Sequence, residues 1–184
     1  TGGSTLTAQQ PMNNIMRVTL QALAAVMGGT QSLHTNGFDE ALSLPTEDAA
    51  RMALRTQQVI GYESGVVDTP DPMAGSYLVE SLTDDVEKLA WEYIETIDAK
   101  GGAVAAIEQG YQMDEIMDSA YAYTKSIDDE ERTIVGVNKF TMDDEPEPAV
   151  FPIDPTLEPG QVERLKRYKA NRDTAAVESA RPVE

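Results

Sequence analysis

The chain has 184 residues with 32 acidic against 14 basic side chains, which gives a formal net charge of −18 at pH 7. This charge disfavours binding to nucleic acid or to an anionic membrane surface, because phosphate groups repel a polyanion. The sequence has no cysteine and one histidine, His34, which excludes disulfides, thiol nucleophiles and multi-histidine zinc sites. Hydrophobic residues make up 41%, enough for a folded core, and no apolar run approaches the roughly 20 residues of a membrane span.

Residues 1–7 contain neither the positive charge nor the apolar stretch of a signal peptide. The chain does not begin with Met, so we expect a segment of a longer, cytoplasmic protein. The acidic residues are spread along the sequence, and lysine is scarcer than arginine. An ordinary acidic protein would show this composition, but we favour a halophilic origin, in which salt screens the self-repulsion of an acidic surface.

Helical spacing of apolar residues first appears over 7–27, with Pro11 suited to the first turn and glycines at 28–29 as a stop. Residues 30–35 are extended in character, and their weak alternation fits a strand buried on both faces as well as a loop. A second helix is predicted over 47–62. This order of helix, strand and helix is a fragment of β/α alternation that cannot make a complete sheet by itself.

The second half of the chain is predicted to be mainly helical. Thr83 is a suitable cap for a helix that the glycines at 101–102 end, and shorter periodic patterns follow over 103–109 and 114–126. We interpret the methionines and tyrosines of the last pattern as core residues. Residues 132–140 are the best strand candidate in the chain, because they are rich in β-branched side chains.

No constellation of catalytic residues is visible from spacing alone. One histidine without a neighbouring motif does not define a nucleophile and its base. The paired glycines are better explained as helix stops than as a phosphate-binding loop. The residues by themselves therefore predict a helix-rich α/β segment and no particular reaction.

Several longer motifs recur in one order: LTAQQPMNNIMR at 6–17, GTQSLHTNGFDEAL at 29–42, LPTE at 44–47, DP at 71–72, GSY at 75–77, IVGVNKF at 134–140 and ERLKR at 163–167. Together they strongly resemble the coenzyme-B12-dependent acyl-CoA mutases, above all the methylmalonyl-CoA mutases, over residues 1 to about 173. Members of this family bind acyl-CoA through a (β/α)8 barrel and hold cobalamin between that barrel and a flavodoxin-like domain.

The resemblance implies an α/β fold, namely the C-terminal portion of a (β/α)8 TIM barrel followed by a mainly helical region. At 184 residues the chain is too short to close a barrel, which typically takes about 250. The implied parts are the last β/α segments at 1–67, a helical region with one strand at 68–142, a linker rich in proline and acid at 143–160, and a helix with a disordered tail at 161–184.

The activity implied by the resemblance is an isomerase reaction, the adenosylcobalamin-dependent interconversion of (R)-methylmalonyl-CoA and succinyl-CoA by a radical 1,2-rearrangement. A sister mutase for isobutyryl-CoA or ethylmalonyl-CoA would share these motifs, and so would an isolated assembly fragment without activity. The implied partners are the remainder of the catalytic chain, a separate or fused cobalamin-binding subunit and the acyl-CoA substrate. We expect the segment alone to be inactive.

No residue of this chain matches the family's catalytic residues, and none is predicted to bind a metal directly. His34 matches neither the catalytic histidine nor the histidine that binds cobalt, so we interpret it as a structural residue or as one that supports the site from behind the contacting residues.

Three residues match positions that face cobalamin in the family, namely Gly3, Glu40 and Ala41, and Gln31 and Leu44 are weaker candidates for the same cavity. A glycine lets the backbone approach the flat corrin ring, and the Glu40 carboxylate can accept hydrogen bonds from corrin amides. Without the motif, Glu40 would be a solvated loop acid or a helix cap. Ser4 departs from the family pattern, which has an aromatic residue beside the glycine.

Overall fold

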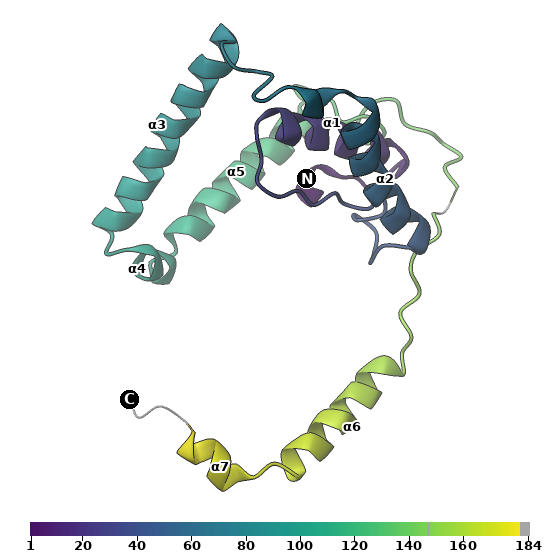
Figure 1. The fold of residues 1–184 in the computed structure, drawn as a ribbon, viewed down its shortest axis with the longest axis vertical. Helices are drawn as coiled ribbons and strands as arrows, with labels where there is room; N and C mark the ends of the chain where they lie inside the picture. The colour runs from purple at the N-terminus through teal and green to yellow at the C-terminus, as the bar shows by residue number, and fades with distance from the viewer. Residues whose placement is uncertain (147, 181–184) are drawn as a thin grey trace. The chain divides into compact units, whose positions relative to one another are not determined.

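A computed structural model describes residues 1–146 and 148–180 of the chain (Figure 1). The described residues are 59% helical and include no β-strand. Their α-helices are α1 (Asn13–Met27), α2 (Glu47–Glu63), α3 (Tyr77–Ala99), α4 (Ala103–Glu108), α5 (Tyr111–Asp128), α6 (Leu157–Ala170) and α7 (Thr174–Ser179), and short 3-10 turns occur at η1 (Gly3–Thr5) and η2 (Val66–Asp68). Contacts divide the chain into two units, Thr1–Val150 and Phe151–Glu184.

The predicted α/β barrel portion is wrong for the described residues, which are mainly helical. A strand needs a neighbour for its backbone hydrogen bonds, and neither predicted strand has a ladder partner in this structure. The segment 30–35 is a loop, and the hydroxyl of Thr35 donates instead to the Ala53 carbonyl, 2.8 Å away. Around 132–140 the chain forms a tight turn, closed by a 2.8 Å hydrogen bond from Gly136 N to Lys139 O.

Helices α1 and α2 pack together and hold most of the buried side chains of the first unit. Small residues, Ala22 on α1 and Ala49 and Ala53 on α2, are buried and allow a close approach of the two helices. The larger buried side chains are Val18 and Ile60. This pair of helices is the platform on which the loop from residue 28 to residue 46 lies.

The predicted helices agree with the observed ones most closely where the signals are local. Helix α2 starts as expected after Thr46, whose side-chain oxygen accepts a hydrogen bond from Ala49 N at 3.2 Å. Helix α1, expected from residue 7, begins only at Asn13, because the backbone of Thr7 bonds to the side chain of Asn14 instead of to a helix. Helix α3 begins after Ser76, earlier than the Thr83 start that the sequence predicts.

The segment α3–α4–α5 forms a helical hairpin (Figure 1) whose long helices bury no residue. Their apolar side chains lie exposed, among them Val86, Leu89, Ile116, Met117 and Tyr121. The methionines and tyrosines of α5, interpreted from the sequence as core residues, are therefore not part of a core formed by the described residues. Nothing in the described part of the chain covers this apolar face.

The second unit contains α6 and α7. Helix α6 accommodates Pro159 in its first turn, where a missing amide hydrogen costs nothing. Helix α7 is capped by the side chain of Asp173, which accepts from Ala176 N at 3.0 Å, although the sequence predicts a disordered tail there. The last residues of that tail, 181–184, lie outside the described residues. The four-part organisation stays a prediction, and the boundary between the two units falls inside the predicted linker.

None of the helices in the described ranges combines the length and the apolar character that crossing a membrane would require.

Candidate functional site

The first unit brings two of the predicted site residues together from separate segments. Gly3 lies in η1, ahead of α1, and Glu40 lies in the loop between α1 and α2. A Cβ atom at Gly3 would lie 3.4 Å from Cγ of Glu40 and 3.5 Å from Nδ2 of Asn36. The glycine backbone and the Glu40 side chain are therefore neighbours, and the absence of a side chain at position 3 leaves the space beside the carboxylate open.

The Glu40 side chain is exposed on a loop whose neighbouring residues, 35–37 and 39, are buried. Its backbone amide donates to the Gly37 carbonyl at 3.2 Å, which fixes the turn. No hydrogen bond or ion pair within the described residues engages its carboxylate. Glu40 lines a cavity of about 390 Å³ together with His34, Gly37 and Gln57. The carboxylate is thus a free acceptor at the edge of a small hollow.

A buried acid anchors the Glu40 loop to α2. Asp39 is 1% exposed, and its Oδ2 accepts hydrogen bonds from the amide and the hydroxyl of Thr46, at 2.8 and 3.0 Å. Thr46 is the N-cap of α2, so the carboxylate also lies near the positive end of that helix dipole. Oδ1 of Asp39 has no hydrogen-bond partner among the described residues. Sequence reasoning missed this residue, because its contact with Thr46 spans seven residues and forms only in the folded loop.

A buried amide anchors the same loop to α1. Asn14 is fully buried, and its Nδ2 donates to the carbonyls of Thr7 and Phe38, each at 2.8 Å. Its Oδ1 accepts from Thr7 N at 3.1 Å and from Nη1 of Arg17 at 2.7 Å. All four hydrogen-bonding positions of the amide are filled. The sequence places Asn14 inside a family motif but does not predict its burial.

The remaining predicted residues are less closely associated with this cavity. Ala41 follows Glu40 directly and is exposed. Gln31 and Leu44 are also exposed, and neither lines the cavity beside Glu40. His34 does line it and is exposed, in the loop that occupies residues 30–35. The structure therefore joins Gly3, Glu40 and Ala41 in one region and leaves the two weaker candidates outside it.

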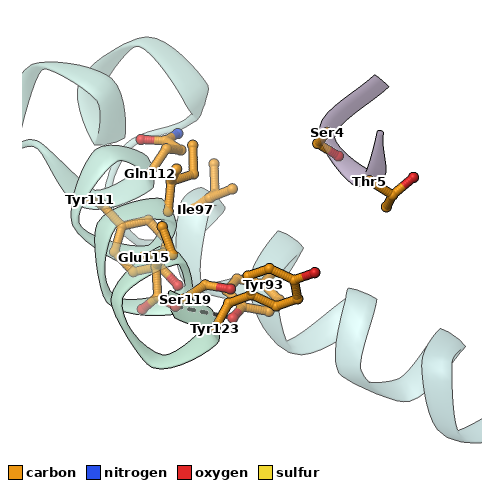
Figure 2. Close-up of a pocket in the computed structure, with 11 residues that line it drawn as sticks. Ser4, Thr5, Tyr93, Ile97, Tyr111, Gln112, Glu115, Ser119 and Tyr123 are labelled. Atoms are coloured by element: carbon orange, nitrogen blue, oxygen red, sulfur yellow. Dashed lines mark hydrogen bonds between the residues drawn. The ribbon is translucent and has the colours of Figure 1, made fainter. Parts of the chain in front are cut away.

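A second cavity, of about 730 Å³, lies between α3 and α5. Figure 2 shows Tyr93 and Glu115 joined by a hydrogen bond, with Ser4 and Thr5 of η1 across the cavity. The phenol of Tyr93 donates to Oε2 of Glu115 at 3.0 Å, and this bond to a carboxylate raises the pKa of Tyr93 above its usual value. The other lining residues include Tyr111, Tyr123, Ile97, Ile116 and Ala120. This mostly apolar lining is typical of a surface that packs against another polypeptide.

Comparisons with known proteins agree with the motifs at these positions. Residues 1–181 match the methylmalonyl-CoA mutase family. The chain is 49% identical over 181 residues to methylmalonyl-CoA mutase of Escherichia coli (strain K12). These aligned residues are 98% of this chain and 25% of the E. coli protein. It is 46% identical over 180 residues to the 2-hydroxyisobutanoyl-CoA mutase large subunit of Aquincola tertiaricarbonis. This alignment covers 97% of this chain and 32% of that subunit.

The mitochondrial methylmalonyl-CoA mutase of Homo sapiens is 45% identical over 179 residues, which are 97% of this chain and 24% of the human protein. The chain thus spans about a quarter to a third of the length of these curated relatives. The family match extends over nearly the whole chain, and the chain belongs to the methylmalonyl-CoA mutase family.

Proposed function

We propose that this chain is part of a cytoplasmic, adenosylcobalamin-dependent mutase that interconverts (R)-methylmalonyl-CoA and succinyl-CoA. The observation that carries the proposal is the contact between Gly3 and Glu40. Two positions that match cobalamin-facing residues of the family meet there from distant parts of the sequence, and the Glu40 carboxylate has no hydrogen bond within the described residues. Membership of the mutase family supports the reaction class.

The residues of this region fit the edge of a cobalamin site. A corrin ring carries peripheral amides whose N–H groups need acceptors, and the Glu40 carboxylate is an exposed acceptor. Gly3 offers a backbone without a side chain, which a flat ring can approach closely. The adjoining cavity of about 390 Å³ is much smaller than the whole cofactor, so this chain supplies one wall and other parts of the protein supply the rest.

When bound, adenosylcobalamin supplies the radical chemistry through homolysis of its cobalt–carbon bond. The task of this chain's own residues is to bind and to orient. Glu40 accepts hydrogen bonds, Gly3 admits the ring, and the buried contacts of Asp39 and Asn14 keep the loop in place.

The acyl-CoA specificity is proposed to reside outside this segment. The relative named 2-hydroxyisobutanoyl-CoA mutase is nearly as similar to this chain as the relatives named methylmalonyl-CoA mutase. A sister mutase for isobutyryl-CoA or ethylmalonyl-CoA is therefore the alternative, and turnover of each acyl-CoA by the complete protein separates the two.

The proposed partners are the remainder of the catalytic chain and a cobalamin-binding subunit or domain. The exposed apolar face of α3 and α5 is the surface proposed to pack against the remainder, since it buries no residue within the described part of the chain. An isolated helical assembly fragment without activity would show the same exposed face. Mutase activity of the complete protein distinguishes a part of the enzyme from such a fragment.

The 184-residue chain alone is expected neither to bind adenosylcobalamin tightly nor to turn over methylmalonyl-CoA, because it supplies one wall of the site. Equilibrium titration with the cofactor and a turnover assay, each with and without the co-produced remainder of the protein, measure this. Mutase activity of the isolated chain would contradict the proposal.

The substitution Glu40→Ala in the complete protein is expected to raise the Kd for adenosylcobalamin roughly tenfold or more, because a hydrogen bond to a charged acceptor is lost. Glu63→Ala, which removes an exposed acid at the end of α2, is the matched control and should leave the Kd unchanged. If both variants bind the cofactor as tightly as the parent protein, Glu40 has no role in binding.

A further inference from the structure

Gly3 and Glu40 belong to different segments, and one side chain is bonded to both of those segments. Asn14 donates to the carbonyl of Phe38, two residues before Glu40, and exchanges two hydrogen bonds with the backbone of Thr7, four residues after Gly3. We propose that Asn14 is a positioning residue that holds the Gly3 segment and the Glu40 loop in the relative position that cofactor binding requires. This inference rests on the proposed function, because it assumes that Glu40 contacts cobalamin.

The position of Asn14 itself is fixed by its place in the fold. It is the second residue of α1, and it is fully buried. Arg17, one turn later, donates from Nη1 both to Oδ1 of Asn14 at 2.7 Å and to Oγ1 of Thr7 at 2.9 Å. A guanidinium can only donate, so the amide oxygen of Asn14 must face Arg17, and its NH2 group must face the two carbonyls. The direction of the amide is thus determined by its neighbours.

The Glu40 loop is held on the other side as well. Asp39 binds Thr46 at the start of α2, so the loop is attached to α1 through Phe38 and to α2 through Asp39. Glu40 follows these two attachment residues directly and is exposed, while residues 35–37 and 39 are buried. A binding group that is held in advance loses less freedom on binding, which favours affinity.

Loss of the amide would release the loop without removing Glu40. Asn14→Asp keeps the shape of the side chain but replaces the NH2 donor with an acceptor that faces the carbonyls of Thr7 and Phe38. Asn14→Ser removes the donor without adding a charge. Thr56→Val is the matched control, because Thr56 is a buried polar residue whose hydroxyl, among the described residues, donates only to Met52 O within α2.

The first experiment uses the complete protein without cofactor and follows amide hydrogen exchange over residues 36–42. We expect faster exchange in both Asn14 variants and unchanged exchange in Thr56→Val. The second experiment measures the Kd for adenosylcobalamin, which should rise roughly tenfold in the Asn14 variants, as the loss of an oriented contact would give.

A double-mutant cycle distinguishes positioning from a general loss of stability. If Asn14 acts through Glu40, Asn14→Ser should weaken binding in the parent protein but add little to Glu40→Ala. A purely structural effect would be equal in both backgrounds. Equal effects, or folded Asn14 variants with an unchanged Kd, would overturn the positioning role.

The outcomes also separate this inference from the proposed function. An unchanged Kd in Glu40→Ala means that the cofactor contact itself is wrong, whatever Asn14 does. If Glu40→Ala raises the Kd for adenosylcobalamin while the Asn14 variants leave it unchanged, the proposed function stands and the positioning role of Asn14 is rejected. If neither Asn14 variant folds, Arg17→Met takes their place, because it removes the guanidinium that orients the Asn14 amide. Arg17→Met must then show the same faster hydrogen exchange, the same rise in Kd and the same result in the double-mutant cycle.

Discussion

Gly37→Ala is expected to lower the free energy of unfolding of the complete protein by about 2–3 kcal/mol, as overpacking of a buried site does. Gly37 is buried, and a Cβ atom there would lie 2.8 Å from Oδ1 of Asp39 and 3.2 Å from Cβ of Ala49. Asp39 cannot easily withdraw, because its other oxygen is bonded to Thr46. Unfolding in urea measures the change.

A second glycine in the same region provides the control for Gly37→Ala. Gly61 lies within α2, and a Cβ atom there would meet no atom of the described residues within 4 Å. Gly61→Ala should therefore stabilise the protein by about 0.5–1 kcal/mol, because alanine favours the helix. The two substitutions are expected to have opposite signs. A stabilising or neutral Gly37→Ala would show that the loop does not pack as described.

Gly136→Ala is expected to cost about 2–5 kcal/mol, from two sources that add. The backbone of Gly136 has φ of +83°, a left-handed conformation that costs a residue with a Cβ about 1–2 kcal/mol. The new Cβ would also lie 3.0 Å from Cδ of Gln10, which adds crowding of about 1–3 kcal/mol. Gln10 is held by a 2.8 Å hydrogen bond from Nε2 to the Phe140 carbonyl and cannot swing away freely.

Gly75→Ala isolates the first of these two costs. Gly75 has φ of +76°, and no atom in the described part of the chain would lie within 4 Å of a Cβ atom there. Its substitution should cost only the conformational part, about 1–2 kcal/mol. Urea unfolding of both variants gives the crowding cost as the difference. If Gly136→Ala costs no more than Gly75→Ala, the turn at 134–140 does not pack on Gln10.

The sequence predicts best those elements whose signals are local. Thr46 and the acids that follow it define the start of α2, and the paired glycines after α1 and α3 define ends that the structure confirms. The start of α1 is predicted six residues too early, because the competing bond between Thr7 and Asn14 is a tertiary contact. The predicted strand at 132–140 fails for a related reason, since β-branched residues make a strand only beside a partner.

The candidate site was predictable only in part. Gly3 and Glu40 stand out because they match positions that face cobalamin in the family, and their proximity is visible only in three dimensions. Asn14 and Asp39 belong to motifs of the same family, but nothing in their sequence surroundings indicates that they are buried. Burial of a polar side chain depends on which carbonyls and amides the fold brings within reach, and this is decided after the helices pack.

Arg17 links two distant parts of the first unit through Nη2, its second terminal nitrogen. Nη2 donates to the Val135 carbonyl at 2.7 Å, across a sequence separation of 118 residues. All of α3, α4 and α5 therefore lies inside one large ring of chain that closes beside Asn14. The free-energy cost of closing a flexible ring rises by only about 0.6 kcal/mol for each doubling of its length. The length of the hairpin therefore contributes little to the entropic cost of the anchor beside Glu40.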